Sequence, residues 1–244
     1  MSKNNDCDVV IVGAAHMDLQ VYPIGKDLLD VASYPAKEMV WSVGGDALNE
    51  ATIITRLGHK VKLISCFGDD MIGSMIMEHC KKNSIDTAHI KQDKEKVTGI
   101  NIGLICEDGE RTFINNRSGS IWTFSPEDVD LDAVNGAGIL SFASIFNNPQ
   151  LDQSLMLPLF KKAKEQNMVI CVDMGETLED IKESLAYVDY FFPNYEEASR
   201  LTGKEDVEEI ADVLIGLGVK NVLIKIGKKG CLVKNAKESF IVPG

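Results

Sequence analysis

The chain has 244 residues, of which 45% are hydrophobic and 25% are charged, a composition typical of globular proteins. Its net charge of −12 would repel phosphate backbones and anionic membrane surfaces, so we expect neither nucleic acid nor membrane as a partner. Six scattered cysteines without a CxxC motif, a polar start at residues 1–7 and the lack of a membrane-length apolar run predict a cytoplasmic protein.

The first apolar run, DVVIVGAA at residues 8–15, predicts a buried β-strand that opens at Gly13. Asp18 follows just beyond this strand, where a carboxylate would face the crevice in which α/β sheets bind ligands. A turn or capping role explains the position of Asp18 equally well. His16 has no nucleophile or second histidine at a supporting spacing, so we expect it to be structural.

The motif GGDALN, which begins at Gly44, is the strongest sign of a binding site. Gly44 and Gly45 allow backbone amides to approach a bound molecule closely. Helical spacing of apolar residues predicts a helix with Asp46 as its N-cap and Gly58 just past its end. Asp46 and Asn49 would then converge with the free amides on a volume suited to a polyhydroxylated molecule, although an ordinary turn before a core helix remains an alternative.

A hairpin interrupts the alternation of strands and helices in the middle of the chain. Segments 98–106 and 111–115 flank the sequence EDGE, and Asp-Gly is a strong hairpin signal. With two weak strands at 19–23 and 38–43, the hairpin would form a small second sheet that covers the ligand crevice. We therefore expect a lid inserted at about residues 17–43 and 97–117.

The remaining pattern alternates short apolar runs with helical ones, which predicts a mostly parallel central sheet between two layers of helices. There is no internal repeat or interdomain linker, so residues 1–244 are expected to form a single α/β domain. The further predicted strands are 61–66, 138–143, 168–173, 188–192 and 221–226, the helices are 71–82, 154–166, 178–185, 196–201 and 207–217, and the last hairpin pairs 230–234 with 240–242.

Three motifs in this order resemble the ribokinase-like (PfkB-type) carbohydrate kinase family. Residues 44–73 are similar to its signature of a Gly-Gly turn, an Asn, RLG and G-x-D-x-x-G. PNYEEASRLTG at 193–203 and LIKIGKKG at 223–230 resemble its later segments. The resemblance implies the ribokinase-like three-layer fold and ATP-dependent phosphorylation of a sugar hydroxyl with Mg²⁺.

The resemblance also implies roles for individual residues. Those expected to contact the sugar are Asp18, Gly44, Gly45, Asp46 and Asn49. Magnesium is expected at Asn194 and Glu197, which spacing alone explains equally well as an N-cap and an exposed acid. The residues expected near the nucleotide are Asn194, Lys225, Gly227 and Gly230; Lys225 could also be a surface charge.

Two arginines of the predicted lid, Arg111 and Arg117, are expected to bear on the substrate. Arg117 resembles the lid arginine of fructokinase-like and 2-keto-3-deoxygluconate-kinase-like members. A guanidinium there could grip a carboxylate, a keto oxygen or a phosphate bidentately. The alternative is that both arginines are surface charges.

The family segment Asp-Thr-x-Gly-Ala-Gly-Asp, which carries the catalytic base, has no counterpart up to Gly244. Asn135-Gly136-Ala137-Gly138 is not followed by a carboxylate. We therefore expect the catalytic Asp beyond Gly244. The alternatives are a non-catalytic sugar or nucleotide binder on this scaffold and a nucleoside kinase of the same family; a dinucleotide-dependent oxidoreductase lacks the G-x-G-x-x-G motif. A homodimer through the lid is expected, because exposed sheet edges pair.

Overall fold

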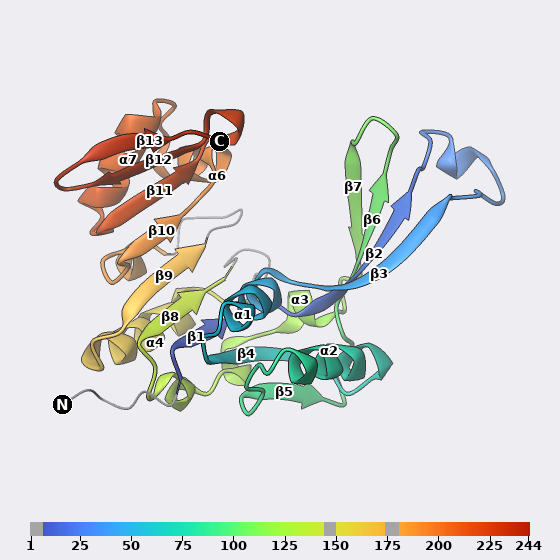
Figure 1. Cartoon of the computed structure of the whole chain (residues 1–244), viewed down its shortest axis with the longest axis horizontal. Coiled ribbons are helices and arrows are strands. Elements are labelled where there is room, and N and C mark those ends of the chain that lie inside the picture. Colours follow the sequence, from blue (N-terminus) through green and yellow to red (C-terminus); the bar gives the residue numbers. More distant parts are fainter. Residues whose placement is uncertain (1–6, 144–149, 174–180) are drawn as a thin grey trace.

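The fold is built on a large β-sheet that crosses the molecule, with a smaller sheet projecting from it (Figure 1). The computed structural model describes residues 7–143, 150–173 and 181–244. Within these residues the large sheet, sheet A, has nine strands, in the spatial order β13 (Ser239–Val242), β12 (Cys231–Asn235), β11 (Asn221–Lys225), β10 (Tyr190–Phe192), β9 (Val169–Asp173), β8 (Ile139–Phe142), β1 (Val9–Val12), β4 (Val61–Gly68) and β5 (Ile90–Asp93).

All strands from β11 to β5 run parallel, and the antiparallel pair β12 and β13 forms one edge of sheet A. This arrangement confirms the predicted α/β class. Strand β5 was not predicted, because its sequence, IKQD, contains neither an apolar run nor a clear alternation.

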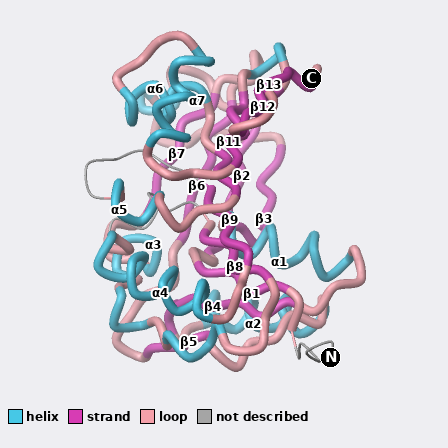
Figure 2. Tube along the Cα trace, turned by 90° about the vertical axis from the view of Figure 1, so that its left-hand side faces the viewer, coloured by secondary structure: helices cyan, strands magenta, loops and turns pink. Residues whose placement is uncertain are grey.

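Helices cover both faces of sheet A (Figure 2). The larger ones are α1 (Asp46–Arg56), α2 (Met71–Lys82), α4 (Gln153–Glu165), α6 (Tyr195–Thr202) and α7 (Val207–Gly216), and the short ones are α3 (Ser120–Thr123), α5 (Lys182–Leu185) and the 3₁₀ turns η1 (Leu28–Asp30), η2 (Pro126–Asp128), η3 (Leu131–Val134) and η5 (Gly227–Lys229). No helix in the described parts of the chain is long and apolar enough to cross a membrane.

The two helical layers follow from the alternation of side chains along the strands. In β1, Val9 and Ile11 are buried with residues of α1 and α2, whereas Val10 and Val12 are buried with residues of α4 and α7. Sheet A is therefore apolar on both faces, and polar residues that serve a function are left to the ends of its strands.

The smaller sheet, sheet B, has the order β3 (Glu38–Gly44), β2 (His16–Tyr22), β6 (Ile100–Ile105) and β7 (Arg111–Asn115). It contains the predicted hairpin and both weak strands, and it projects from the body of the molecule (Figure 1). This geometry agrees with the argument that a hairpin between parallel units does not enter the central sheet.

Residues paired across neighbouring strands point to the same side, and near the base of sheet B the two faces differ in polarity. One row on the polar face consists of Ser42, Asp18, Asn101 and Asn115. The apolar face carries Leu19, Met39, Trp41, Ile102 and Ile114, of which Met39, Trp41 and Ile114 are exposed.

Two predicted details were wrong, and a third lies partly outside the described residues. Asp46 is not the N-cap of α1; Gly45 occupies that position with a non-helical φ of 97°, and the helix starts at Asp46. Asp18 lies inside β2 rather than in a connection beyond the first strand, because the lid strand begins already at His16. Of the predicted helix 178–185, residues 182–185 form α5, and 178–180 are outside the described residues.

Candidate functional site

The glycine pair that precedes α1 is required by close packing of the chain against itself. A Cβ at Gly44 would lie 1.9 Å from Oδ2 of Asp18, and a Cβ at Gly45 would lie 2.3 Å from the carbonyl oxygen of Ala14. Gly45 also has a φ of 97°, which side-chain-bearing residues rarely adopt. The pair therefore holds Asp18 directly against the turn that starts α1, which brings these predicted sugar contacts together.

Asp18 is held in place by its neighbours on the polar face of sheet B. Its Oδ1 accepts a hydrogen bond from Nδ2 of Asn101 at 3.1 Å and lies 3.3 Å from Nε2 of His16. Partial burial raises the pKa of Asp18, but the contacts with His16 and Asn101 outweigh this effect and hold the pKa below its usual value. Asp18 is therefore a fixed carboxylate with Oδ2 available as an acceptor for a hydroxyl group.

Two further polar groups lie on α1, one turn into the helix. Asn49 is exposed, and its side chain forms no hydrogen bond with another described residue. Glu50, which the sequence analysis did not single out, accepts a hydrogen bond from Oγ of Ser141 at 2.7 Å. Burial raises the pKa of Glu50 to about 7, and the charges of Asp173 and Asp46 contribute in the same direction. Glu50 is therefore half-protonated near neutral pH.

Lys225 ends strand β11 and its ammonium group meets a carboxylate at the end of β9. Its Nζ lies 2.9 Å from Oδ1 of Asp173, and its side chain is 51% exposed. The exposed position agrees with the surface alternative, while the ion pair explains why a lysine follows the buried Ile224. Asp173, Lys225 and Glu50 interact electrostatically at the same edge of sheet A.

Asn194 and Glu197 form a capping box at the start of α6. Oδ1 of Asn194 accepts from the backbone N–H of Glu197 at 2.9 Å, and Oε2 of Glu197 accepts from the N–H of Asn194 at 2.7 Å. Burial raises the pKa of Glu197. The capping box uses Oδ1 of Asn194 and Oε2 of Glu197 and leaves Oε1 of Glu197 available.

This pair fits a Mg²⁺ ion that takes only one or two protein oxygens and completes its shell with phosphate oxygens and water. It does not fit a cage of protein ligands. No group of three or more histidine, cysteine or acidic side chains able to hold a metal occurs in residues 7–143, 150–173 and 181–244.

A cavity of about 650 Å³ lies beside the capping box. It is lined by Asn194, Lys225 and Gly227 and by the starts of α6 and α7. A Cβ at Gly227 would meet nothing within 4 Å, so this glycine leaves the cavity open. Gly230 differs, because its Cβ would lie 1.9 Å from the carbonyl oxygen of Val242. A glycine is therefore needed at position 230 because the backbone packs closely against the end of β13.

Arg111 and Arg117 lie near opposite ends of strand β7. Arg111 pairs with Ile105 at the hairpin end of the sheet, four residues along β7 from Asn115. At about 3.3 Å per residue it is about 13 Å from the row that contains Asp18. Arg117 lies just beyond Asn115, and its guanidinium carbon is 5.1 Å from the centre of the Trp122 ring. The structure brings Arg117, and not Arg111, to the base of sheet B.

Sequence reasoning missed Glu50, Asn101, Asp173 and Trp122. A weak signal existed for Asn101, a polar residue in an otherwise apolar strand segment, TGINIGLIC. Glu50 immediately follows Asn49 in the glycine motif. The pairing of Glu50 with Ser141 spans 91 residues and that of Lys225 with Asp173 spans 52, and no local pattern shows such contacts.

These features define an α/β protein with a polar site where a glycine turn meets a projecting sheet, and a separate cavity along the same strand ends. The profile of the pfkB family carbohydrate kinases matches residues 6–244, and the chain belongs to this family. The resemblance noted in the motifs is thereby confirmed.

Similar proteins include plant and bacterial sugar kinases. Probable fructokinase-2 of Arabidopsis thaliana is 24% identical over 217 residues, which are 87% of this chain and 62% of that protein. Fructokinase of Solanum tuberosum is 30% identical over 131 residues, 53% of this chain and 41% of the relative. The chain thus spans less than two thirds of the length of these curated relatives.

Solved structures share the fold over almost the whole chain. Arabidopsis thaliana ribokinase complexed with ribose and ATP has a TM-score of 0.81 at 26% identity, covering 97% of this chain and 78% of that one. Halothermothrix orenii fructokinase has a TM-score of 0.79 at 23% identity, covering 97% and 85%. The second similarity concerns the fold alone.

Proposed function

We propose that this protein is an ATP- and Mg²⁺-dependent kinase that phosphorylates a sugar hydroxyl, with fructokinase-like or 2-keto-3-deoxygluconate-kinase-like specificity. The observation that carries the proposal is the contact of Asp18 with the Gly44–Gly45 turn on the polar face of sheet B. A carboxylate with one oxygen fixed by Asn101 and the other free is suited to accept hydrogen bonds from sugar hydroxyls. Family membership and the fructokinases and ribokinases among the relatives support this substrate class.

In this proposal the sugar contacts Asp18, Asp46, Asn49 and the glycine amides. The nucleotide occupies the cavity beside Asn194, Lys225 and Gly227, and Lys225 exchanges Asp173 for phosphate oxygens. Bound Mg²⁺ would neutralise phosphate charge. Glu197 would hold it through Oε1, and Asn194 through the second lone pair of Oδ1. Closure of sheet B over the sugar would exclude water and limit hydrolysis of ATP.

The test is a coupled assay of ADP release by the complete gene product with ketohexoses, ribose, sugar acids and nucleosides. The proposal expects turnover of at least one sugar or sugar acid. Turnover of nucleosides alone would assign a nucleoside kinase. Sugar binding by calorimetry without any transfer would indicate a non-catalytic binder instead.

We further propose that two copies associate through the apolar face of sheet B. Trp41 is 52% exposed, Met39 is 65% exposed and Ile114 is 53% exposed on this face, an arrangement that marks interaction surfaces. Light scattering should give a dimer for the unchanged chain and a monomer for Ile114→Glu. A clean monomer of the unchanged chain at working concentration would contradict this proposal.

All six cysteines are free in the structure. Burial raises the pKa of Cys66, Cys80 and Cys171 to about 11, so these thiols are unreactive. We propose a reducing, cytoplasmic location, because a chain with six free cysteines suits such a compartment. Localisation of a tagged gene product by fluorescence microscopy tests it.

A further inference from the structure

We propose that Trp122 is a positioning residue that fixes two hydrogen-bond donors, Asn115 and Arg117, to receive a carboxylate group of the sugar substrate. The inference rests on the proposed kinase function and specifies its substrate as a sugar acid. It starts from contacts that belong to neither the glycine turn nor the nucleotide cavity.

The indole of Trp122 makes two contacts with the base of sheet B. Its Nε1 donates a hydrogen bond to Oδ1 of Asn115 at 2.8 Å. The guanidinium carbon of Arg117 lies over the face of the ring, 5.1 Å from its centre. Because the amide oxygen of Asn115 is occupied, its Nδ2 group remains as a donor. One tryptophan therefore orients two donors and no acceptor.

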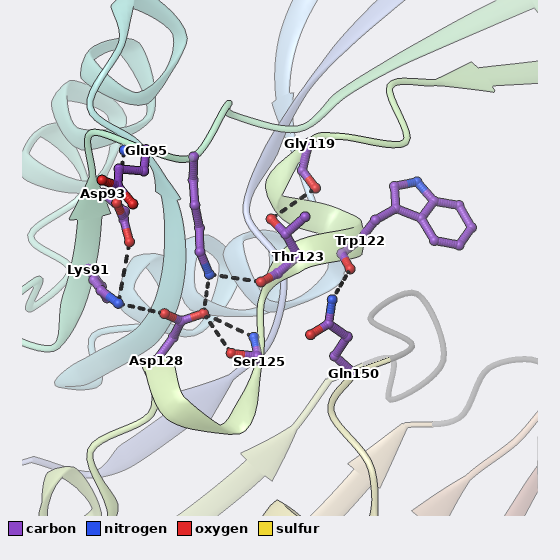
Figure 3. A network of polar contacts seen from close by, with 10 residues as sticks. Lys91, Asp93, Glu95, Gly119, Trp122, Thr123, Ser125, Asp128 and Gln150 are labelled. Carbon is purple, nitrogen blue, oxygen red and sulfur yellow. Dashed lines mark hydrogen bonds and ion pairs between the residues drawn. The ribbon is translucent and has the colours of Figure 1, made fainter.

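Trp122 is itself held firmly, because the short helix α3 is anchored on both sides. Nε2 of Gln150 donates to the carbonyl oxygen of Trp122 at 2.8 Å, and Nζ of Lys96 donates to that of Thr123 at 2.8 Å. Lys96 also pairs with the buried Asp128. Figure 3 shows the indole projecting from α3 on the side away from this Asp128 network. Because these contacts hold the backbone of α3, the point from which the indole projects is fixed.

The register of sheet B places the two donors next to the proposed sugar site. Asn115 pairs with Asn101, and Asn101 pairs with Asp18, so the three side chains share one face. Two strand spacings separate Asn115 from Asp18, about 10 Å. The long side chain of Arg117 starts two residues beyond Asn115. An elongated sugar can contact the acceptor Asp18 at one end and these donors at the other.

The charge pattern indicates what the donors bind. Arg117 has no carboxylate partner within the described residues, although the chain contains 37 acidic residues. Asn115 Nδ2 likewise donates to no described group. A planar guanidinium and an amide donor match the two oxygens of a carboxylate, whereas a sugar hydroxyl would satisfy only one of them. A substrate carboxylate supplies the missing acceptor.

Calorimetry on the unchanged chain with 2-keto-3-deoxygluconate and, separately, D-fructose tests the inference without requiring turnover. Trp122→Phe keeps the ring under Arg117 but removes the N–H group. It should weaken binding of the acid about tenfold and leave fructose affinity within about twofold. Trp122→Ala should weaken acid binding further, so that Trp122→Phe represents a partial rescue. Asn135→Ala, at an exposed asparagine before β8, is the control and should bind like the unchanged chain.

A double-mutant cycle separates positioning from a general structural role. In an Asn115→Ala background, Trp122→Phe should cause little additional loss of acid binding, because both changes remove the same hydrogen bond. Additive losses, or equal losses for acid and fructose, would overturn the inference. Fructose binding without acid binding would also overturn it and leave the kinase proposal intact, whereas binding of neither compound would count against both.

Discussion

Gly45 and Gly58 have nearly the same positive φ angle but very different surroundings. Their φ angles are 97° and 94°, yet a Cβ at Gly45 would lie 2.3 Å from the Ala14 carbonyl oxygen, while one at Gly58 would meet nothing within 4 Å. Gly58→Ala should therefore cost about 1 kcal/mol of unfolding free energy through strain alone. Gly45→Ala should cost more than about 3 kcal/mol, because the backbone must also move. Urea unfolding of both variants measures this, and equal costs would contradict the packing account of the glycine pair.

Glu50 makes stability depend on pH in a direction opposite to that of most acidic residues. Its pKa is about 7 in the folded chain against an ordinary value of 4.5, so the folded state binds more protons between these values. The free energy of unfolding should therefore fall as pH rises from 4.5 to 7, by at most about 3 kcal/mol for this group.

Glu50→Gln removes the titration and keeps an oxygen for the hydrogen bond from Ser141. The variant should resemble the unchanged chain near pH 4.5 and be the more stable of the two at pH 8. Urea unfolding at both pH values tests the sign. A difference that does not change with pH would show that Glu50 is not buried in the way described.

At the scale of elements, Asp128 in η2 joins the segment after sheet B to strand β5. It is 3% exposed and pairs with Lys91 at 2.7 Å (Figure 3). It also pairs with Lys96. Burial raises its pKa, but the two lysines and Ser125 outweigh this and lower the pKa to about 2. Its contribution to stability is present above the ordinary value of 3.8 and is lost as pH falls through about 2.

Asp128→Asn should cost about 3–5 kcal/mol at pH 7, because two cations remain at a site that has lost its carboxylate. The matched control is Asp132→Asn in η3, which also pairs with a lysine but is 74% exposed, so solvent screens the pair and the free energy of unfolding should change far less. Urea unfolding measures both. Similar small losses would mean that the Asp128 network does not anchor α3.

The elements themselves were largely predictable from sequence, since β1, β4, β8, β9 and β11 are apolar runs and the Asp-Gly hairpin has a specific turn signal. The boundary of β2 and the cap of α1 were not. Both depend on the tight approach of Asp18, Ala14 and the glycine turn, which is a tertiary contact. For the same reason the partners of Glu50 and Trp122 could not be read from local patterns.

At the scale of the whole molecule, the fold separates two binding regions along the strand ends of sheet A. The glycine turn and the polar face of sheet B lie at one, and the cavity beside Asn194 and Lys225 lies at the other. The separate locations allow sugar and nucleotide to be tested independently. Both regions carry residues expected from the motifs, whereas the electrostatic interactions of Glu50 with Asp46 and Lys225 emerged only from the structure.

The most direct test is calorimetric titration of the unchanged chain and Asp18→Asn with a bound sugar and, separately, with ADP and Mg²⁺. Asn keeps the shape that fits against Gly44, but it removes the negative charge and replaces one of the two acceptor oxygens with an NH₂ donor. The account predicts at least about tenfold weaker sugar binding and unchanged nucleotide affinity for Asp18→Asn. Unchanged sugar affinity, or an equal loss for both ligands, would contradict a sugar site at Asp18.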